Sequence, residues 1–378
     1  MSVTGIIFSN IHDDNISELT RVRTLASVPF GCRYRLIDFP LSNMVNSNIS
    51  NIKVIANYNY HSLMDHIGSG KDWDLARRSG GVKILPPYID PHMNLNSNTS
   101  YNTRLEALKG IGYSIAQMTC DYVVMTDCDV ICNIDFNDMI NDHIASGADV
   151  TMAVKRMELD RATARANTIV FSSREGRITD LLLNPTNFDG FADVSLNILV
   201  VNRKYLQDLV LDATSHGYIS LNRDIFLRNL PMKNFRTYRY DGYFACISSF
   251  DDYFAHNMQL IENKEMFDSL FNIPERPIFT KVRNSAPTYY SETSTVKDSL
   301  IADGCVIEGT VENSILFRGV RVGKGAVVKN SILFQDTIIS DGASVAYTVS
   351  DKNVVIRNNV TLSGHSTLPL YIERGKMV

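Results

Sequence analysis

The stretch NSILF at residues 313–317 recurs unaltered at residues 330–334, which is a spacing of 17 residues. Aliphatic residues step by six within each unit, as from Val322 to Val328 and from Ile339 to Val345. About three such steps per repeat are typical of a triangular coil of short parallel strands whose aliphatic side chains point inward. The repeat therefore predicts a left-handed parallel β-helix of hexapeptide type over residues 291–378.

Four bulky residues lie beside the inward-facing positions of this repeat: Leu316, Phe317, Leu333 and Phe334. A coil of only about four turns leaves an edge and an apolar face that neighbours could cover. We expect these side chains either to stack between turns or to form an interface with another subunit.

Residues 1–275 show a different pattern, in which apolar runs alternate with helix-like segments. Buried strands are predicted at residues 3–8, 52–56, 122–126 and 150–154, and helices at residues 61–67, 104–118, 135–144 and 250–271. Strands separated by helical crossovers imply a Rossmann-like α/β domain with a mostly parallel sheet. Ligands of such sheets bind beyond the carboxyl ends of the strands, so chemistry is expected after Phe8 and after Thr126.

Two segments are predicted to lack regular structure. Residues 94–103 are rich in Asn, Ser and Thr and are expected to form a surface loop. Pro274, Pro277 and Pro287 mark a linker over residues 276–290 between the two domains.

Charge and composition exclude several classes of protein. The 378 residues carry 37 Lys and Arg against 41 Asp and Glu, a net charge of −4, which excludes nucleic-acid binding driven by bulk positive charge. No apolar run approaches the roughly 18 residues that would span a bilayer. The six cysteines are scattered without a C-x-x-C pair, so they predict neither a disulfide nor a metal site. We expect a soluble, cytoplasmic protein with no nucleic-acid or membrane partner.

Two long motifs carry a resemblance to a known family. Residues 29–47 (PFGCRYRLIDFPLSNMVNS) and residues 62–75 (SLMDHIGSGKDWDL) resemble the bacterial glucose-1-phosphate adenylyltransferase (ADP-glucose pyrophosphorylase) family, and most of all its GlgD-type regulatory subunit. The resemblance covers nearly the whole chain, including the predicted β-helix. It implies a nucleotidyltransferase domain and a role in glycogen biosynthesis, where ATP and glucose 1-phosphate give ADP-glucose and pyrophosphate.

The family's reaction requires groups that stabilise charge on the pyrophosphate leaving group. Backbone N–H groups of a Gly-rich loop, cationic side chains and carboxylates that hold Mg²⁺ supply this stabilisation. The family's first strand runs into G-G-x-G-x-R-L, whereas residues 9–15 here read SNIHDDN, with no glycine and two carboxylates. The resemblance therefore implies a damaged phosphate site.

Further family positions are changed as well. Leu25 replaces the second lysine of K-R-x-K-P, and Glu106 stands at the acidic position of G-T-A-D-A. The sugar-phosphate lysine of E-K-P falls at Asn184, and the second metal carboxylate, in R-D-V-G, aligns with Cys246. Asp129 is the sole retained candidate for catalysis and for metal binding. We expect no cofactor unless residual activity remains, in which case the expected ion is Mg²⁺.

Four arginines, Arg21, Arg23, Arg33 and Arg35, lie within 15 residues of one another. The arginine fork suits phosphate, and the family uses sugar-phosphate effectors, so these residues are candidate anion and effector contacts. The alternative is a surface of ordinary ion pairs.

The resemblance and the changed positions together predict a regulatory subunit whose own activity is low or absent. Its expected partner is a catalytic glucose-1-phosphate adenylyltransferase subunit, in a hetero-oligomer of tetrameric size. The first alternative is an active sugar-phosphate nucleotidyltransferase with a rearranged site. The second is an acyltransferase of hexapeptide type, for which His365 is the one histidine in the predicted coil.

Overall fold

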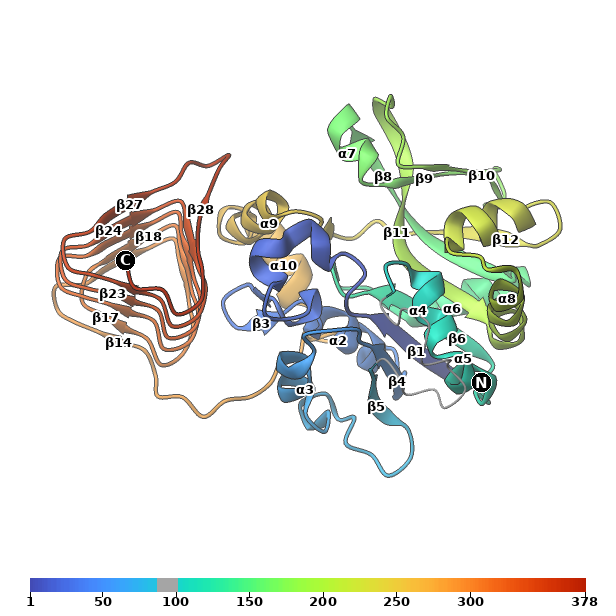
Figure 1. Ribbon diagram of the computed structural model, residues 1–378, viewed down its shortest axis with the longest axis horizontal. Coiled ribbons are helices and arrows are strands. Elements are labelled where there is room, and N and C mark those ends of the chain that lie inside the picture. The colour runs from blue at the N-terminus through green and yellow to red at the C-terminus, as the bar shows by residue number, and fades with distance from the viewer. Residues whose placement is uncertain (87–100) are drawn as a thin grey trace.

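Strand β1 (Val3–Phe8) lies in the middle of the sheet that organises the first domain (Figure 1). The computed structural model describes residues 1–86 and 101–378, so the predicted surface loop at residues 94–103 falls largely outside the described residues. The strand order is β10 (Ile178–Leu183), β9 (Thr168–Ser172), β11 (Gly190–Asn202), β6 (Tyr122–Asp127), β1, β4 (Asn51–Ile55) and β5 (Gly81–Leu85). Strands β6, β1, β4 and β5 run parallel, as predicted, whereas β11 is antiparallel to β6. Strand β8 (Val150–Leu159) joins β11 to β12 (Phe235–Arg239).

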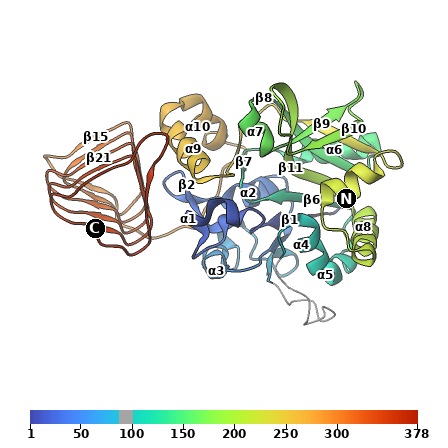
Figure 2. The ribbon, with the colours of Figure 1, turned by 45° about the horizontal axis from the view of Figure 1, so that its top comes forward.

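Helices cover both faces of this sheet (Figures 1 and 2). The bounds are α1 (Ser17–Thr20), α2 (Asp38–Asn46), α3 (His61–Ile67), α4 (Arg104–Gly110), α5 (Gly112–Ala116), α6 (Phe136–Ser146), α7 (Arg161–Arg165), α8 (Arg203–His216), α9 (Phe250–Glu262) and α10 (Lys264–Phe271). Successive β1 residues point to opposite faces: Ile6 and Phe8 pack with Leu105 of α4, and Ile7 packs in the cluster that contains Phe39 of α2. Burial on both faces explains why β1 is a continuous apolar run. Within the described residues no helix is long and apolar enough to cross a membrane.

Two predicted helices are each divided in the structure. The segment at residues 104–118 forms α4 and α5, with the break at Ile111 between Gly110 and Gly112, because glycine is a poor helix former. The segment at residues 250–271 forms α9 and α10. Asn263 separates them, and its side chain accepts a hydrogen bond from the Met266 N–H at the start of α10.

The second domain is the predicted left-handed β-helix, which confirms the repeat analysis. Its three parallel sheets are β14 (Tyr289–Tyr290), β17 (Val306–Ile307), β20 (Arg321–Val322), β23 (Ile338–Ile339) and β26 (Val355–Ile356); β15 (Thr295–Lys297), β18 (Thr310–Glu312), β21 (Val327–Lys329), β24 (Ser344–Ala346) and β27 (Thr361–Ser363); and β16 (Leu300–Ile301), β19 (Ile315–Leu316), β22 (Ile332–Leu333), β25 (Thr348–Ser350) and β28 (Leu370–Ile372). Residues six apart, such as Val322 and Val328, meet in one buried cluster inside the coil. Figure 1 shows the turns stacked beside the first domain.

One sheet of the coil, β16 to β28, packs against the first domain. Leu316 and Leu333 point into the coil, whereas Phe317 and Phe334 belong to the core cluster of the first domain. The two phenylalanine rings lie one turn apart with centroids 5.3 Å from each other, and Phe334 also meets Tyr253 of α9 at 6.3 Å. All four residues are buried within the chain. This corrects the expectation of a subunit interface at these positions, because the chain's own first domain covers them.

The segment between the domains is held by hydrogen bonds. Helix α10 ends at Phe271 and the first coil strand begins at Tyr289. Between them, Asn46 of α2 donates to the Pro277 carbonyl at 3.0 Å, and the Phe279 N–H donates to Ser42 Oγ at 2.9 Å. These two hydrogen bonds fix the connecting segment to α2.

A buried ion pair joins the two domains at this junction. One terminal nitrogen of Arg23 lies 2.6 and 2.8 Å from the two carboxylate oxygens of Asp351, with both side chains at most 3 % exposed. The Tyr371 hydroxyl donates to the same carboxylate at 3.0 Å, and the guanidinium of Arg23 lies over the Phe334 ring. A buried carboxylate needs such partners, because an unpaired charge in the interior is costly.

We predict that Arg23→Leu lowers the free energy of unfolding by about 3–5 kcal/mol, because it leaves Asp351 buried and unpaired. The measurement is urea unfolding followed by fluorescence of the single tryptophan, Trp73, and by circular dichroism. Arg21→Leu is the matched control: Arg21 pairs with Glu373 at 2.6 Å on the surface, and such pairs contribute at most about 1 kcal/mol. Equal effects of the two substitutions would contradict the role of the Arg23–Asp351 pair in stabilising the junction of the domains.

Candidate functional site

The loop after β1 is held by its own polar side chains. Ser9 Oγ donates to the Ile55 carbonyl at 2.8 Å, and Asn10 Nδ2 donates to Asp13 Oδ2 at 2.6 Å. The other carboxylate oxygen of Asp13 accepts from the Leu25 N–H at 3.0 Å. Burial raises the pKa of Asp13 to about 7. This loop is therefore closed by side chains and is not an open cradle of backbone N–H groups for phosphates.

Asp127 ends β6 at the carboxyl edge of the sheet, opposite Phe8 in the parallel register with β1. Arg104, the first residue of α4, reaches it with two nitrogens: Nε lies 2.8 and 3.0 Å from the carboxylate oxygens, and Nη2 makes a further short contact. Asp127 is 2 % exposed. Arg104 thus supplies the positive charge that a buried carboxylate requires.

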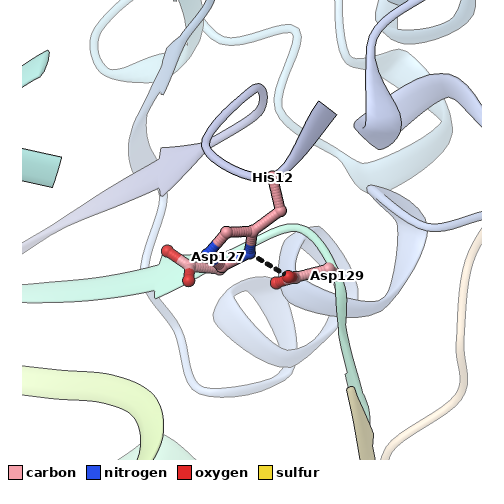
Figure 3. A group of neighbouring side chains, drawn as sticks. All are labelled: His12, Asp127 and Asp129. Atoms are coloured by element: carbon pink, nitrogen blue, oxygen red, sulfur yellow. Dashed lines mark hydrogen bonds and ion pairs between the residues drawn. The ribbon is translucent and has the colours of Figure 1, made fainter. Parts of the chain in front are cut away.

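Asp129 follows two residues later and meets His12 from the loop after β1. Nδ1 of His12 lies 2.5 Å from Oδ2 of Asp129, and Figure 3 shows the imidazole between the carboxylates of Asp127 and Asp129. Burial alone would lower the pKa of His12, but the charge and the hydrogen bond of Asp129 outweigh it and raise the pKa. Burial alone would raise the pKa of Asp129, but His12 and Arg104 together hold it below its ordinary value. Each side chain of the pair therefore favours the charged form of the other.

Cys246 completes this group of side chains. It lies on β13 (Phe244–Cys246), which pairs antiparallel with β7 (Val130–Cys132), and its sulfur is 3.8 Å from Oδ2 of Asp129. The sequence-predicted positions of Asp129 and Cys246 are thus brought together.

A cleft of about 440 Å³ opens beside these residues. Its lining includes His12, Arg104, Arg165, Asn184 and Cys246. The cleft lies beyond the carboxyl ends of β1 and β6, which is the place where ligands of such sheets bind.

The other changed positions have different surroundings. The Leu25 side chain is buried in the hydrophobic core, while its N–H holds Asp13. Glu106 caps α4, because its carboxylate accepts from the Asn102 N–H and from Thr103 Oγ1. Asn184 lines the cleft and donates to the Arg165 carbonyl at 2.9 Å. None of these three side chains brings a cation to the cleft.

The donors around Asp129 do not fit Mg²⁺. That ion requires near-octahedral oxygen ligands, usually carboxylates, waters and phosphates. Here the neighbours of the Asp129 carboxylate are an imidazole nitrogen and a cysteine sulfur, and Asp127 is already bound by Arg104. These residues therefore do not form the oxygen-rich site that Mg²⁺ requires.

The four candidate effector arginines are separated by the fold. Arg23 is engaged with Asp351 and Arg21 with Glu373, so neither is a free anion contact. Arg33 and Arg35 instead line a small cleft at the junction of the two domains. Three cations that the sequence did not single out join them there: Arg283, Arg318 and Lys352.

His12 and Arg104 were not identified as site residues from the sequence. His12 stands 117 positions from Asp129, and Arg104 stands 23 positions from Asp127, so only the fold brings the pairs together. The sequence did offer a signal. His12 stands in the loop where the family has glycines, and Arg104 stands where the family's G-T-A-D-A has threonine.

We predict that Arg104→Met lowers the free energy of unfolding by about 3–5 kcal/mol, because Asp127 is then buried without a partner. Adding Asp127→Asn recovers part of this loss, since it removes the unpaired charge. The readout is urea unfolding followed by Trp73 fluorescence. Arg77→Met is the control, because its pair with Asp74 is exposed and worth less than about 1 kcal/mol. A double variant as unstable as Arg104→Met alone would refute the pairing argument.

Comparison with known proteins places this geometry in a family. A sequence model of the nucleotidyl transferase family matches residues 14–220, and a model of the GlmU-like C-terminal hexapeptide matches residues 285–366. The glycogen biosynthesis protein GlgD of Bacillus subtilis is 36% identical over 98% of this chain and 95% of that protein. GlgD of Geobacillus stearothermophilus is 36% identical over 86% of this chain and 82% of its own length.

An enzyme of that second organism is similar too. The glucose-1-phosphate adenylyltransferase of Geobacillus stearothermophilus is 35% identical over 82% of this chain and 80% of the enzyme. The nucleotidyl transferase match covers most of the first domain, and the hexapeptide match covers the β-helix. The chain therefore belongs to the nucleotidyltransferase family, within the group of glycogen biosynthesis proteins that includes GlgD and the related glucose-1-phosphate adenylyltransferases.

Proposed function

We propose that the chain is a regulatory, largely noncatalytic subunit that pairs with a catalytic glucose-1-phosphate adenylyltransferase subunit in a hetero-oligomer. The observation that carries the proposal is the pairing of Arg104 with Asp127 and of His12 with Asp129. His12 thereby occupies Asp129, the one carboxylate left for a metal-dependent phosphoryl transfer, and Arg104 occupies its neighbour Asp127. The sheet of the first domain is present, but the charged side chains at its edge are paired with one another.

The missing phosphate contacts support the same proposal. Leu25 and Asn184 stand where the family has lysines, and the loop after β1 is closed by Asn10 and Asp13. Loss of one preorganised donor typically lowers the rate by about 10²–10³-fold. Such losses are not additive, yet the absence of loop, lysines and one metal carboxylate together leaves little stabilisation of the leaving group.

A second candidate is an active sugar-phosphate nucleotidyltransferase with a rearranged site. The observation in its favour is the retained cleft of about 440 Å³ beside Asp129. The cleft has room for a substrate, and Arg165 on its wall offers a cation. The assay below distinguishes the two candidates.

The regulatory proposal includes a binding site for a phosphorylated effector at the junction of the domains. Arg33, Arg35, Arg283, Arg318 and Lys352 line one cleft there. Arg318 is paired with Asp303 at 3.1 Å, and the charge of the other four suits a sugar phosphate. Arg35 is held by its contacts to the Ser62 carbonyl and hydroxyl. The cleft is bounded by both domains, so an anion bound in it would contact both.

We expect the purified chain alone to form ADP-glucose at least about 10³-fold more slowly than the catalytic subunit of the same organism. Mixing the two subunits should give a complex on size-exclusion chromatography, with a changed rate or effector response. The control mixture replaces this chain by an unrelated protein of similar size. Robust synthesis by the chain alone, within tenfold of the catalytic subunit, would favour the second candidate instead.

Anion binding at the junction should depend on pH. Burial, together with the nearby charges of Arg35, Arg23 and Arg283, lowers the pKa of Lys352 to about 7, and Asp351 opposes this shift. Lys352 therefore gains its charge as the pH falls through about 7, and the cationic form attracts an anion more strongly. Sulfate is the probe, because its own charge is constant in this range.

Isothermal titration should show sulfate affinity rising as the pH falls from 8.5 to 6.5, by up to about tenfold per pH unit above the pKa and less below it. Lys352→Met should remove the pH dependence, whereas Lys324→Met, which changes an exposed lysine of the coil, should keep it. An affinity that does not change with pH in the parent chain would contradict a role of Lys352.

A further inference from the structure

The group of side chains around Asp129 has the donor chemistry of a transition-metal site. His12 offers an imidazole nitrogen, Asp129 a carboxylate and Cys246 a sulfur. The donor atoms of His12, Asp127 and Asp129 all lie within 4.8 Å of one another, and Cys246 approaches the same oxygen of Asp129 that His12 contacts. Figure 3 shows the imidazole and the two carboxylates facing one another.

The backbone fixes three of these donors before any ion arrives. Asp129 lies in the turn between β6 and β7, and its carbonyl accepts from the Ile247 N–H at 3.0 Å. That bond, with the pairing of Cys246 against Val130, sets the sulfur beside the carboxylate. His12 belongs to the loop that Asn10 and Asp13 close. The sulfur lies outside the 4.8 Å group that His12 forms with the two carboxylates, so metal binding requires the Cys246 and His12 side chains to turn toward a common centre while the backbone stays in place.

One atom in this group lacks a partner. Oδ1 of Asp129 is buried and accepts no hydrogen bond, although Asp129 is only 1 % exposed. A buried ionised oxygen without a partner costs about 1–3 kcal/mol or more, so such an atom in a folded protein requires an explanation. A cation bound by the carboxylate would supply the missing partner.

We propose that His12, Asp129 and Cys246 bind a divalent transition metal of the zinc class, with a fourth position open to the cleft. Imidazole and thiolate are ligands that such ions prefer, and three protein ligands with one open position are typical of zinc sites that bind a small molecule. Mg²⁺ prefers oxygen ligands and is excluded by the same donors. Binding releases the Cys246 thiol proton and the proton shared by His12 and Asp129 to solvent.

Charge balance agrees with this assignment. A divalent ion is neutralised by one thiolate and one carboxylate, while His12 binds as a neutral ligand. Asp127 remains paired with Arg104 and adds no net charge. The site thus stays electrically neutral in the buried region between the cleft and the core, which avoids the cost of an isolated interior charge.

The test is titration of the chelator-treated full chain with Co²⁺, whose absorption spectrum reports its ligands. We expect one Co²⁺ per chain and a thiolate-to-metal charge-transfer band, displaced by stoichiometric Zn²⁺ but not by a large excess of Mg²⁺. Cys246→Ser should abolish the band and weaken Co²⁺ binding at least about tenfold, and His12→Asn should weaken it similarly. Cys246→Asp should bind Co²⁺ without the band.

Cys128→Ser is the matched control, because Cys128 is a buried neighbour whose sulfur donates to the Ser9 carbonyl at 3.5 Å. It should keep the band and the affinity. Circular dichroism checks that each variant is folded. The proposal is overturned if the parent chain shows no charge-transfer band, if the band survives in Cys246→Ser, or if folded His12→Asn binds Co²⁺ as tightly as the parent.

Discussion

The need to pair two buried carboxylates governs the site of this protein. Asp127 ends β6 and Asp129 lies in the turn to β7, where the sheet is buried on both faces, and both are at most 2 % exposed. Ionised groups in such a place require cations within contact distance, because the interior cannot solvate them. Arg104 and His12 meet this requirement from two other segments. The start of α4 and the loop after β1 are thereby tied to the end of β6.

The same requirement explains the junction of the two domains. Asp351 belongs to the coil and Arg23 to the first domain, and each is the other's buried partner. Two residues later, the Leu25 N–H holds Asp13 in the loop that carries His12. Residues 23–35 therefore run from the interdomain ion pair at Arg23, past the contact of Leu25 with the loop that carries His12, to the cleft lined by Arg35. This continuity gives a physical route from an anion at the junction to the loop that carries His12.

The sequence predicted those parts of the fold that depend on local pattern. The apolar run of β1 and the 17-residue repeat at residues 313–334 led directly to the parallel strands and to the coil. The break at Asn263 was not predicted, because helical periodicity continues across it while a side-chain cap restarts the helix. The burial of Phe317 and Phe334 was also missed, since the surface that covers them comes from a distant part of the chain. For Arg23 the ion-pair alternative holds, but its partner could not be named from the sequence because it lies 328 positions away.

The candidate site shows the difference between losing a group and replacing it. Leu25 and Asn184 simply lack the charge that the family's lysines carry, and their side chains make ordinary contacts. Arg104, His12 and Cys246 each bring a new donor or charge to the retained carboxylates. An alignment scores both kinds of change as departures from a motif, but their physical consequences are opposite. A lost cation removes a favourable contact for a phosphate, whereas the new groups stabilise the buried Asp127 and Asp129. A chain that keeps these two buried acids must pair them in some way, and here a guanidinium, an imidazole and a thiol take the positions around them.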